Sequence, residues 1–198
     1  ELQALLKLGS IAGDENLGWE LIRHVQPIAA DRVAKIGRDR VVSTVRHLRA
    51  RAVVEHDAGP NTDESVVGTD VKNGEGGIRD IEFLVQALQM LHLRLAPEVV
   101  TGNTLAALDR LEEAGILPPE TTSTLRTHYL FLRRIEHFLQ VYDDQQLHAI
   151  PAEPEAQSKL TRVVMGENSN AGEMLQHLET TLREVHGFYL DIVAKDAR

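Results

Sequence analysis

Cysteine is absent from this sequence, so the chain forms no disulfide and carries no thiolate chemistry. That absence fits a cytoplasmic protein, which is the location we expect. Aromatic residues make up only 4%, against 42% hydrophobic residues in all, so we expect a core built mainly of Leu, Val, Ile and Ala. Positive charge is not in excess either. The net charge of -9 argues against a general nucleic-acid-binding protein.

Long apolar runs are missing too. No stretch approaches the roughly 20 residues that a membrane-spanning helix needs, and no signal peptide is recognisable. We therefore expect no membrane association. The chain opens in the middle of an apolar pattern and without an initiator Met, so we expect it to be a piece of a longer protein.

What the sequence does contain is helical periodicity. Apolar spacing, capping residues and Gly or Pro stops predict helices over residues 15–25, 28–56, 79–95, from Asn103 or Thr104 to Gly115, 118–147, 155–165 and 171–194. Residues 57–69 are polar and rich in turn formers, which indicates an exposed loop, and residues 69–72 indicate a short strand. The fold class expected is mainly α, a helical bundle with at most one or two short strands.

Two features of the first half lead to specific expectations. Asp14 is a good N-cap for the first of these helices, and its apolar residues are expected to be buried: Leu17, Trp19, Leu21, Ile22 and Val25. If the helix over 28–56 is continuous through Gly37, a basic stripe runs along it, made of Lys35, Arg38, Arg46 and Arg49. The stripe is either a solvated face or a basic wall facing phosphate or an acidic partner.

The most informative stretch is a Gly-rich turn that leads into the helix over 79–95. It carries Lys72, Gly74, Gly76 and Gly77, and the next turn adds Arg79, Asp80 and Glu82. A flexible backbone with cations and carboxylates is the local chemistry of a phosphate or nucleotide site. The stretch is neither a Walker loop nor a dinucleotide fingerprint, because no Gly-Lys-Ser/Thr follows and the Gly spacing differs.

The charged residues of this stretch leave several readings open. The glycines make either a ligand cradle or a tight turn that serves structure alone. Arg79, Asp80 and Glu82 pair with one another, complement the helix N-terminus, or reach a nucleotide or metal. Glu82 lies between Ile81 and Phe83, so we expect it to be partly buried and to need a partner.

Other polar residues give weaker signals. None of the nine histidines has a neighbour at metal-ligand spacing. On the helix over 118–147, Arg133 is one turn from His137 and Glu136 is one turn from Gln140, which favours salt bridges and hydrogen bonds between helices. The Asp143-Asp144 pair looks like a polar helix end; a metal site there is the minority interpretation.

Four blocks, in order along the chain, resemble a known family. They are Ala4-Leu-Leu-Lys7 with Ala12-Gly-Asp14, the run Asp70-Val-Lys-Asn-Gly-Glu-Gly-Gly-Ile-Arg-Asp-Ile-Glu-Phe-Leu-Val-Gln86, the run Tyr129-Leu-Phe-Leu-Arg-Arg-Ile-Glu-His-Phe-Leu-Gln140, and Asp144-Gln-Gln-Leu-His-Ala-Ile-Pro151. Together they resemble the bifunctional glutamine synthetase adenylyltransferase/adenylyl-removing family. The Gly-Gly-Ile-Arg-Asp-Ile-Glu form is more similar to its N-terminal, deadenylylating half, since we expect another residue in place of Arg79 in the other half.

The resemblance implies regulation of nitrogen assimilation. The N-terminal half of such an enzyme removes AMP from a tyrosine of glutamine synthetase by phosphorolysis, and the other half attaches AMP from ATP with Mg²⁺ held by carboxylates. By this resemblance, residues 1–75 are the end of a nucleotidyltransferase domain, the source of any short strands, and residues 76–198 are the helical domain behind it. Lys72, Gly76, Gly77 and Arg79 would border the nucleotide, and Asp80 and Glu82 would orient that wall or hold a metal-bound water.

Two departures from the family pattern limit the assignment. The Gly-Ser…Asp-x-Asp metal motif is absent and would lie upstream of Glu1, so we expect no catalytic residue and no metal ligand in this chain. Where the family has Lys-Ala-Arg-Pro-Val-Ala-Gly-Asp, this chain has Lys7-Leu-Gly-Ser-Ile-Ala-Gly-Asp14 and lacks that Arg. We therefore predict that the chain alone is inactive and binds neither Mg²⁺ nor ATP, ADP or phosphate firmly. The alternatives are a helical module that binds glutamine synthetase or a PII-type regulator, and a spacer between catalytic halves.

Overall fold

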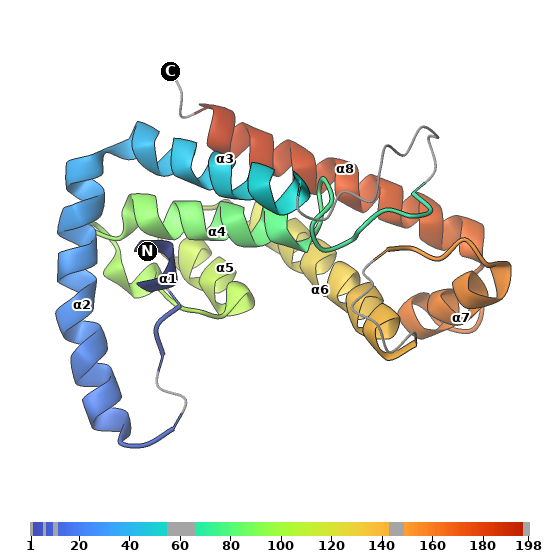
Figure 1. The fold of residues 1–198 in the computed structure, drawn as a ribbon, viewed down its shortest axis with the longest axis horizontal. Helices are drawn as coiled ribbons and strands as arrows, with labels where there is room; N and C mark the ends of the chain where they lie inside the picture. The colour runs from blue at the N-terminus through green and yellow to red at the C-terminus, as the bar shows by residue number, and fades with distance from the viewer. Residues whose placement is uncertain (1, 6, 10–11, 55–65, 143–148, 196–198) are drawn as a thin grey trace. The chain divides into compact units, whose positions relative to one another are not determined.

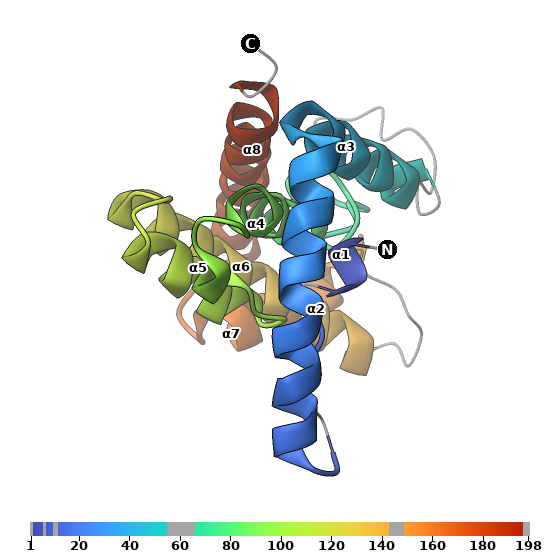
Figure 2. The same cartoon turned by 90° about the vertical axis from the view of Figure 1, so that its left-hand side faces the viewer.

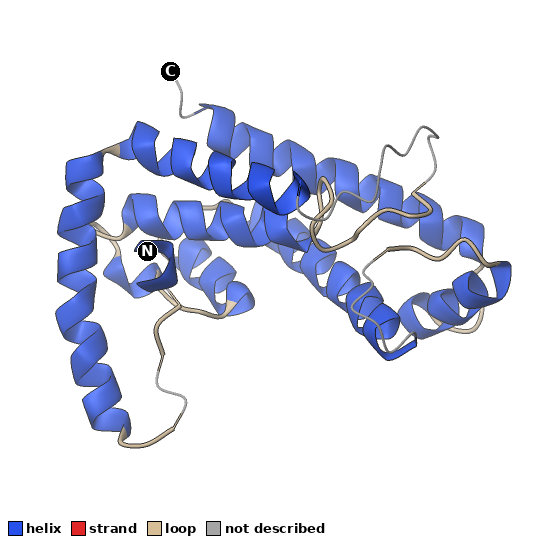
Figure 3. Ribbon diagram, viewed as in Figure 1, coloured by secondary structure: helices blue, strands red, loops and turns tan. Residues whose placement is uncertain are grey.

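The computed structural model describes residues 2–5, 7–9, 12–54, 66–142 and 149–195. Its regular elements are helices, as Figures 1 and 3 show: α1 (Leu2–Leu5), α2 (Glu15–Ile36), α3 (Arg38–Val54), α4 (Ile78–His92), the 3-10 helix η1 (Pro97–Val99), α5 (Thr104–Glu113), α6 (Pro119–Tyr142), α7 (Pro154–Met165) and α8 (Ala171–Lys195). The expected mainly α class is confirmed. Within the described residues, the only β pairing is an isolated bridge between Asp70 and Ala149.

The chain divides into two compact units. Unit 1 comprises Glu1–His47, Glu82–Arg126 and Ile192–Arg198, and unit 2 comprises Leu48–Ile81 and Thr127–Asp191. Both are built from segments far apart in sequence. These units do not test the division expected between residues 75 and 76, which concerns the ancestry of the two parts, and that division stays a prediction.

Unit 1 is built around short connections between its helices. Helix α1 contacts α2 (Figure 2), and η1 contacts α5. The side-chain amide of Gln89, on α4, donates to the carbonyls of Val99 at 2.9 Å and Thr101 at 3.0 Å, which fixes the segment that follows η1. Asn103 caps α5 by accepting from the N–H of Ala106 at 3.0 Å, so Asn103 rather than Thr104 is the cap.

Unit 2 holds the Gly-rich turn together with most of α6, all of α7 and most of α8. Buried aliphatic residues from these helices form its core: Leu132, Ile135, Leu139, Leu160, Val164, Met174, Leu178, Leu182 and Val185. The N–H of Gly68 donates to the carbonyl of Ile150 at 2.8 Å, and the N–H of Ile150 donates to the carbonyl of Thr69 at 3.1 Å. These main-chain bonds tie the start of the turn to the segment before α7.

Most helix ends fall close to the expected positions, and the expected core is confirmed. Among the buried apolar residues, aliphatic side chains predominate, and Phe83, Phe131 and Tyr189 are the aromatic ones in the described part. Leu95 is 86% exposed because α4 ends at His92, one turn earlier than the apolar spacing indicated. The predicted loop at 57–69 and the Asp143-Asp144 pair fall largely or wholly outside the described residues.

The prediction of a helix break near residue 26 is wrong, since α2 runs unbroken from Glu15 to Ile36 with Pro27 inside it. Its half-buried or buried positions, Ile22, Val25, Ala29 and Val33, keep a spacing of three or four residues across the proline. Proline removes one helical hydrogen bond, and a continuous inward face explains why α2 continues through it.

The predicted burial of the first apolar cluster is also wrong for three residues. Leu17 is 67%, Trp19 56% and Leu21 54% exposed. At about 100° per residue, these positions lie well to the side of the face that contains Ala29. A helix as long as α2 buries one stripe, and its other apolar residues are left outside that stripe.

The continuous basic stripe does not exist, because Gly37 has a φ of +77° and separates α2 from α3. Lys35 therefore belongs to a different helix from the arginines that follow. Arg49 is neither a solvated nor an open wall residue, since only 12% of its side chain is exposed and it is bound to Asp80. For the described residues, no helix is both long enough and apolar enough to cross a lipid bilayer.

Candidate functional site

The Gly-rich turn is wound around Asp70. Its carboxylate accepts from the backbone N–H groups of Lys72 at 2.8 Å and Asn73 at 2.9 Å, and from the Asn73 side-chain amide at 3.0 Å. The N–H of Gly74 donates to the Asp70 carbonyl at 2.9 Å. A short acidic side chain that bonds the backbone two or three residues ahead is a common way to close a turn. Local chemistry at Asp70 therefore shapes the start of this segment.

Most other backbone N–H groups of the turn also donate hydrogen bonds within the turn itself. The N–H groups of Gly77, Ile78, Arg79 and Asp80 donate to the carbonyls of Gly74, Val71, Lys72 and Gly77 at 3.0 Å each. A phosphate cradle needs N–H groups that point at the ligand. Because these groups are used, we expect side chains rather than these N–H groups to bind a phosphate at this edge of unit 2.

The two central glycines are required by packing. Gly76 has a φ of +72°, and a Cβ there would lie 1.8 Å from the Leu182 carbonyl oxygen on α8. A Cβ on Gly77 would lie 2.7 Å from the carbonyl oxygen of Val71. The turn thus presses its backbone against α8 at a distance that only glycine permits. Their predicted contact with a nucleotide is untested and stays a prediction.

Asp80 fixes the turn to two helices. Arg49 of α3 donates through Nε to Oδ1 at 2.8 Å and through Nη2 to Oδ2 at 3.1 Å, and the N–H of Gly76 donates to Oδ2 at 2.8 Å. His186 Nδ1 of α8 lies 3.7 Å from the same Oδ2. The Asp80 side chain is 1% exposed. Such a two-pronged guanidinium–carboxylate pair is both strong and directional.

The surroundings of Arg49 keep it charged. Burial by itself would lower its pKa, but the hydrogen bond and charge of Asp80, aided by Glu75 and Tyr189, outweigh burial and raise the pKa. The Glu75 carboxylate lies 3.7 Å from Nη1, and the guanidinium carbon sits 5.8 Å from the centre of the Tyr189 ring. The Arg49 guanidinium therefore remains protonated over the whole range in which a protein is folded.

A second buried carboxylate, Glu136 on α6, also bonds the turn. Lys72 Nζ lies 3.1 Å from Oε1, and Arg133 Nη1 lies 2.6 Å from Oε2. Gln140 Nε2 donates to Oε1 at 3.4 Å, and Arg133 Nη2 lies 3.2 Å from His137 Nε2. The predicted pairings of Arg133 with His137 and of Glu136 with Gln140 exist, but within α6 rather than between helices.

The structure accounts for the predicted site residues in different ways. Lys72, Arg79 and Glu82 are half-buried, as expected for Glu82, whereas Asp80 is wholly inside. Arg49 and Glu136 were missed as members of this site. A signal existed for Glu136, because it follows Leu132 by four residues and precedes Leu139 by three, at the spacing of a buried face.

A divalent metal does not fit the described residues. No group of three or more His, Asp or Glu side chains in the described ranges is arranged to hold an ion. The two buried carboxylates, Asp80 and Glu136, face guanidinium and ammonium groups, and a cation would have to displace them.

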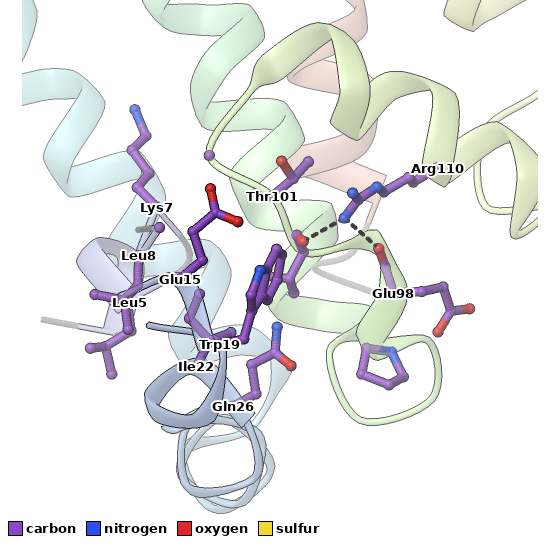
Figure 4. A pocket seen from close by; sticks show the side chains of 14 residues that line it. Leu5, Lys7, Leu8, Glu15, Trp19, Ile22, Gln26, Glu98, Thr101 and Arg110 are labelled. Atoms are coloured by element: carbon purple, nitrogen blue, oxygen red, sulfur yellow. Dashed lines mark hydrogen bonds between the residues drawn. The ribbon is translucent and has the colours of Figure 1, made fainter. Parts of the chain in front are cut away.

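Unit 1 contains a separate cavity of about 550 Å³ (Figure 4). The Trp19 indole projects into it between the side chains of α1 and the segment after η1, and Arg110 closes one side by donating to the carbonyls of Glu98 at 3.0 Å and Val100 at 2.8 Å. The wall combines apolar and charged groups: Leu5, Leu8, Ile22, Lys7, Glu15 and Gln26. Its volume is that of a small-molecule site.

Comparison with known proteins finds matches along most of the chain. The family model of GlnD PII-uridylyltransferase matches residues 45–193. Three curated relatives are each named bifunctional glutamine synthetase adenylyltransferase/adenylyl-removing enzyme: those of Thioalkalivibrio sulfidiphilus, 35% identical over 81% of this chain and 16% of the relative, Streptomyces coelicolor, 36% over 76% and 14%, and Methylococcus capsulatus, 33% over 98% and 19%. The chain thus spans less than a fifth of the length of these relatives.

Proposed function

This chain belongs to the GlnD PII-uridylyltransferase family, and from that premise we propose that it is a helical part of an enzyme that attaches AMP to glutamine synthetase and removes it. The observation that carries the proposal is the similarity, at 33–36% identity over 76–98% of this chain, to relatives named for that activity. The family model matches residues 45–193, which include the Gly-rich turn, Arg49 and Glu136. Its expected cytoplasmic location stays a prediction.

The finer proposal is that the chain comes from the deadenylylating half. Support comes from Gly76-Gly-Ile-Arg79 with Asp80 and Glu82 behind it, the form that resembles that half. In the reaction, an oxygen of inorganic phosphate attacks the AMP phosphorus, the bond to the tyrosyl oxygen breaks, that oxygen takes a proton, and ADP leaves. ATP serves the opposite reaction.

The turn acts as one wall of that site. Lys72 and Arg79 are its cationic side chains, and both are half-buried. Gly76 and Gly77 let the wall pack on α8, and Asp80 anchors it through Arg49. Glu82 follows on the next turn of α4 and orients the wall. This division of labour agrees with the internal use of the backbone N–H groups, which leaves binding to the side chains.

The test uses the full-length enzyme with Arg79→Ala and, separately, Glu82→Ala. Each should lower the turnover of deadenylylation at least about tenfold, the order of one lost charged contact, while the melting temperature stays within a few degrees. Arg134→Ala, an exposed arginine on α6, is the matched control and should keep full turnover. Loss of the fold in step with loss of activity would support a purely structural role instead.

The second candidate is a helical module that binds glutamine synthetase or a PII-type regulator without contacting nucleotide. One observation favours it: on one side of α2, three large apolar residues, Leu17, Leu21 and Ile28, are each more than half exposed, and such patches often mark partner surfaces. Binding of either protein that weakens with Leu21→Ser, while Arg79→Ala has no effect on turnover, would favour this module. If neither variant changes binding or turnover, the spacer reading gains.

A further inference from the structure

Glu136 holds two cations from different segments of unit 2 at one place. Its carboxylate is 1% exposed, yet the side chains of Lys72 and Arg133, which it binds, are 28% and 36% exposed. The arrangement therefore has a buried negative end and a positive end that reaches solvent. A buried carboxylate is stable only with such partners, and here its partners carry more charge than it does.

The excess charge is local and available. Two cations, Lys72 and Arg133, contact the one buried carboxylate of Glu136. Asp70, the other carboxylate bonded to this part of the turn, accepts from backbone and amide N–H groups and from neither cation. An ammonium and a guanidinium each have more N–H groups than Glu136 and His137 take up. Anions bind where several such donors converge, and phosphate is bound well by paired Lys and Arg.

The orientation of these donors is fixed from behind. Arg133 is held on one side by Glu136 Oε2 at 2.6 Å and on the other by His137 Nε2 at 3.2 Å, so its planar group is restricted. Lys72 starts on the Gly-rich turn, whose backbone is closed by Asp70. Preorganised donors lose little side-chain freedom when a ligand binds.

We propose that Lys72 and Arg133 form a binding site for a phosphate group, and that Glu136 is the positioning residue that holds both cations in place. This inference rests on the proposed function in one respect: phosphorolysis consumes inorganic phosphate and yields ADP, so phosphate groups of either source are present. The shared chemistry is a tetrahedral phosphate oxyanion. The site extends the turn's wall from residues 72–82 onto α6.

The experiment measures binding of inorganic phosphate and of ADP to the full-length enzyme by calorimetry. Lys72→Met and Arg133→Met should each weaken binding of phosphate groups about tenfold, as expected for loss of one charged hydrogen bond. Arg133→Lys, which keeps the charge, should recover part of that loss, and Arg134→Met, the neighbouring exposed arginine, should change nothing. Glu136→Gln should weaken binding less than either cation variant, since both cations remain.

The ligand that is affected identifies the source. A weaker affinity for inorganic phosphate, with a raised KM for phosphate and a nearly unchanged kcat, supports a site for the attacking phosphate. A weaker affinity for ADP alone supports a site for a nucleotide phosphate. Equal binding of both ligands by wild type, Lys72→Met and Arg133→Met would overturn the proposal, provided that melting temperatures show folded proteins. If both Met variants unfold, Lys72→Gln and Arg133→Gln carry the same comparison.

Failure of this site and failure of the proposed function have different signatures. If the wild-type enzyme does not deadenylylate glutamine synthetase but the variants lose phosphate binding, the phosphate site is supported and the proposed function is wrong. If the variants deadenylylate normally, with an unchanged KM for phosphate and an unchanged affinity for ADP, the proposed function is supported and the phosphate site is wrong.

Discussion

Asp80 and Glu136 are both buried carboxylates that bind the same turn, yet their surroundings differ. The partners of Asp80 are themselves inside: Arg49 has 12% of its side chain exposed, and the N–H of Gly76 belongs to a buried residue. The partners of Glu136, Lys72 and Arg133, are about a third exposed. A buried carboxylate thus anchors a contact closed to solvent at Asp80, and at Glu136 it supports a pair of cations that face solvent.

We infer from this difference that Asp80 serves the stability of the turn, whereas Glu136 serves ligand binding beside it. At Asp80 both carboxylate oxygens accept hydrogen bonds from groups that are themselves buried, the Arg49 guanidinium and the Gly76 N–H, so we expect this contact to act on stability. At Glu136 the carboxylate is bound by Lys72 and Arg133, but these two cations are partly exposed to solvent and can bind a ligand as well. Variants at the first place should therefore change the free energy of unfolding, and variants at the second should change ligand affinity more than stability.

Gly76→Ala should have the largest effect on stability. Its Cβ would overlap the Leu182 backbone, and the strain of a left-handed residue adds to the cost of overpacking, for a total of about 4 kcal/mol. Urea unfolding measures the loss. Gly115→Ala is the control, since Gly115 has a similar φ of +68° with nothing within 4 Å of its Cβ position, and it should cost only about 1 kcal/mol. Equal losses would show that the contact with α8 is looser than described.

Arg49→Met should be next. It leaves the Asp80 carboxylate buried beside the turn without its cation, at a cost of about 3 kcal/mol, because breaking one side of a buried pair strands the other charge. Chemical unfolding again gives the number. The double variant Arg49→Met with Asp80→Asn should recover part of it, since no full charge is then left inside. A double variant as unstable as the sum of its singles would argue against direct coupling.

Lys72→Met should cost less, about 1 kcal/mol, because Arg133 and Gln140 still satisfy Glu136 and the lost ammonium was partly in water. The informative result is how the loss of stability compares with the loss of phosphate affinity. Relative to Arg49→Met, this variant should have the smaller effect on unfolding and the larger effect on phosphate affinity. The reverse order in both measurements would remove the contrast between the two carboxylates.

Lys159→Met should have the smallest effect. Lys159 and Glu155 form an exposed pair at 2.7 Å on α7, and the urea midpoint should not move measurably. The hydrogen bond and charge of Lys159 lower the pKa of Glu155, so the pair stabilises the fold above the ordinary pKa of Glu155 and less as the pH falls through the lowered value. In an NMR titration, the variant should return the pKa of Glu155 to its ordinary range.

Sequence patterns located most of the helices because their signals are local. Asp14, Asn103, Gly115 and Gly166 mark helix ends with capping or positive-φ chemistry that acts within a few residues. Pro27 misled the prediction because its local preference was outweighed by a face of α2 that continues on both sides of it. The order of helices α2 to α8 could be read from the chain; the short elements α1 and η1, and which apolar residues of α2 would be covered, could not.

The candidate site was predictable only in part. The sequence singled out Asp80 and the glycines, but the partner of Asp80 is Arg49, which lies 31 positions away, and a pattern assigned it to a stripe on an assumed continuous helix. Glycine is required at position 76 because the Leu182 carbonyl of α8, more than a hundred residues later in the chain, leaves no room for a Cβ. Such contacts depend on how distant segments pack, and spacing within one segment carries no information about them.

The main-chain bonds between residues 68–69 and Ile150 have a consequence for how this protein opens. They hold two non-helical segments together without using a side chain, so ordinary substitutions leave them intact. The amide hydrogens of Gly68 and Ile150 are therefore shielded from solvent only while the two segments stay joined. Their exchange with deuterium would occur together, and its rate would report how often the base of the Gly-rich turn separates from the segment that leads into α7.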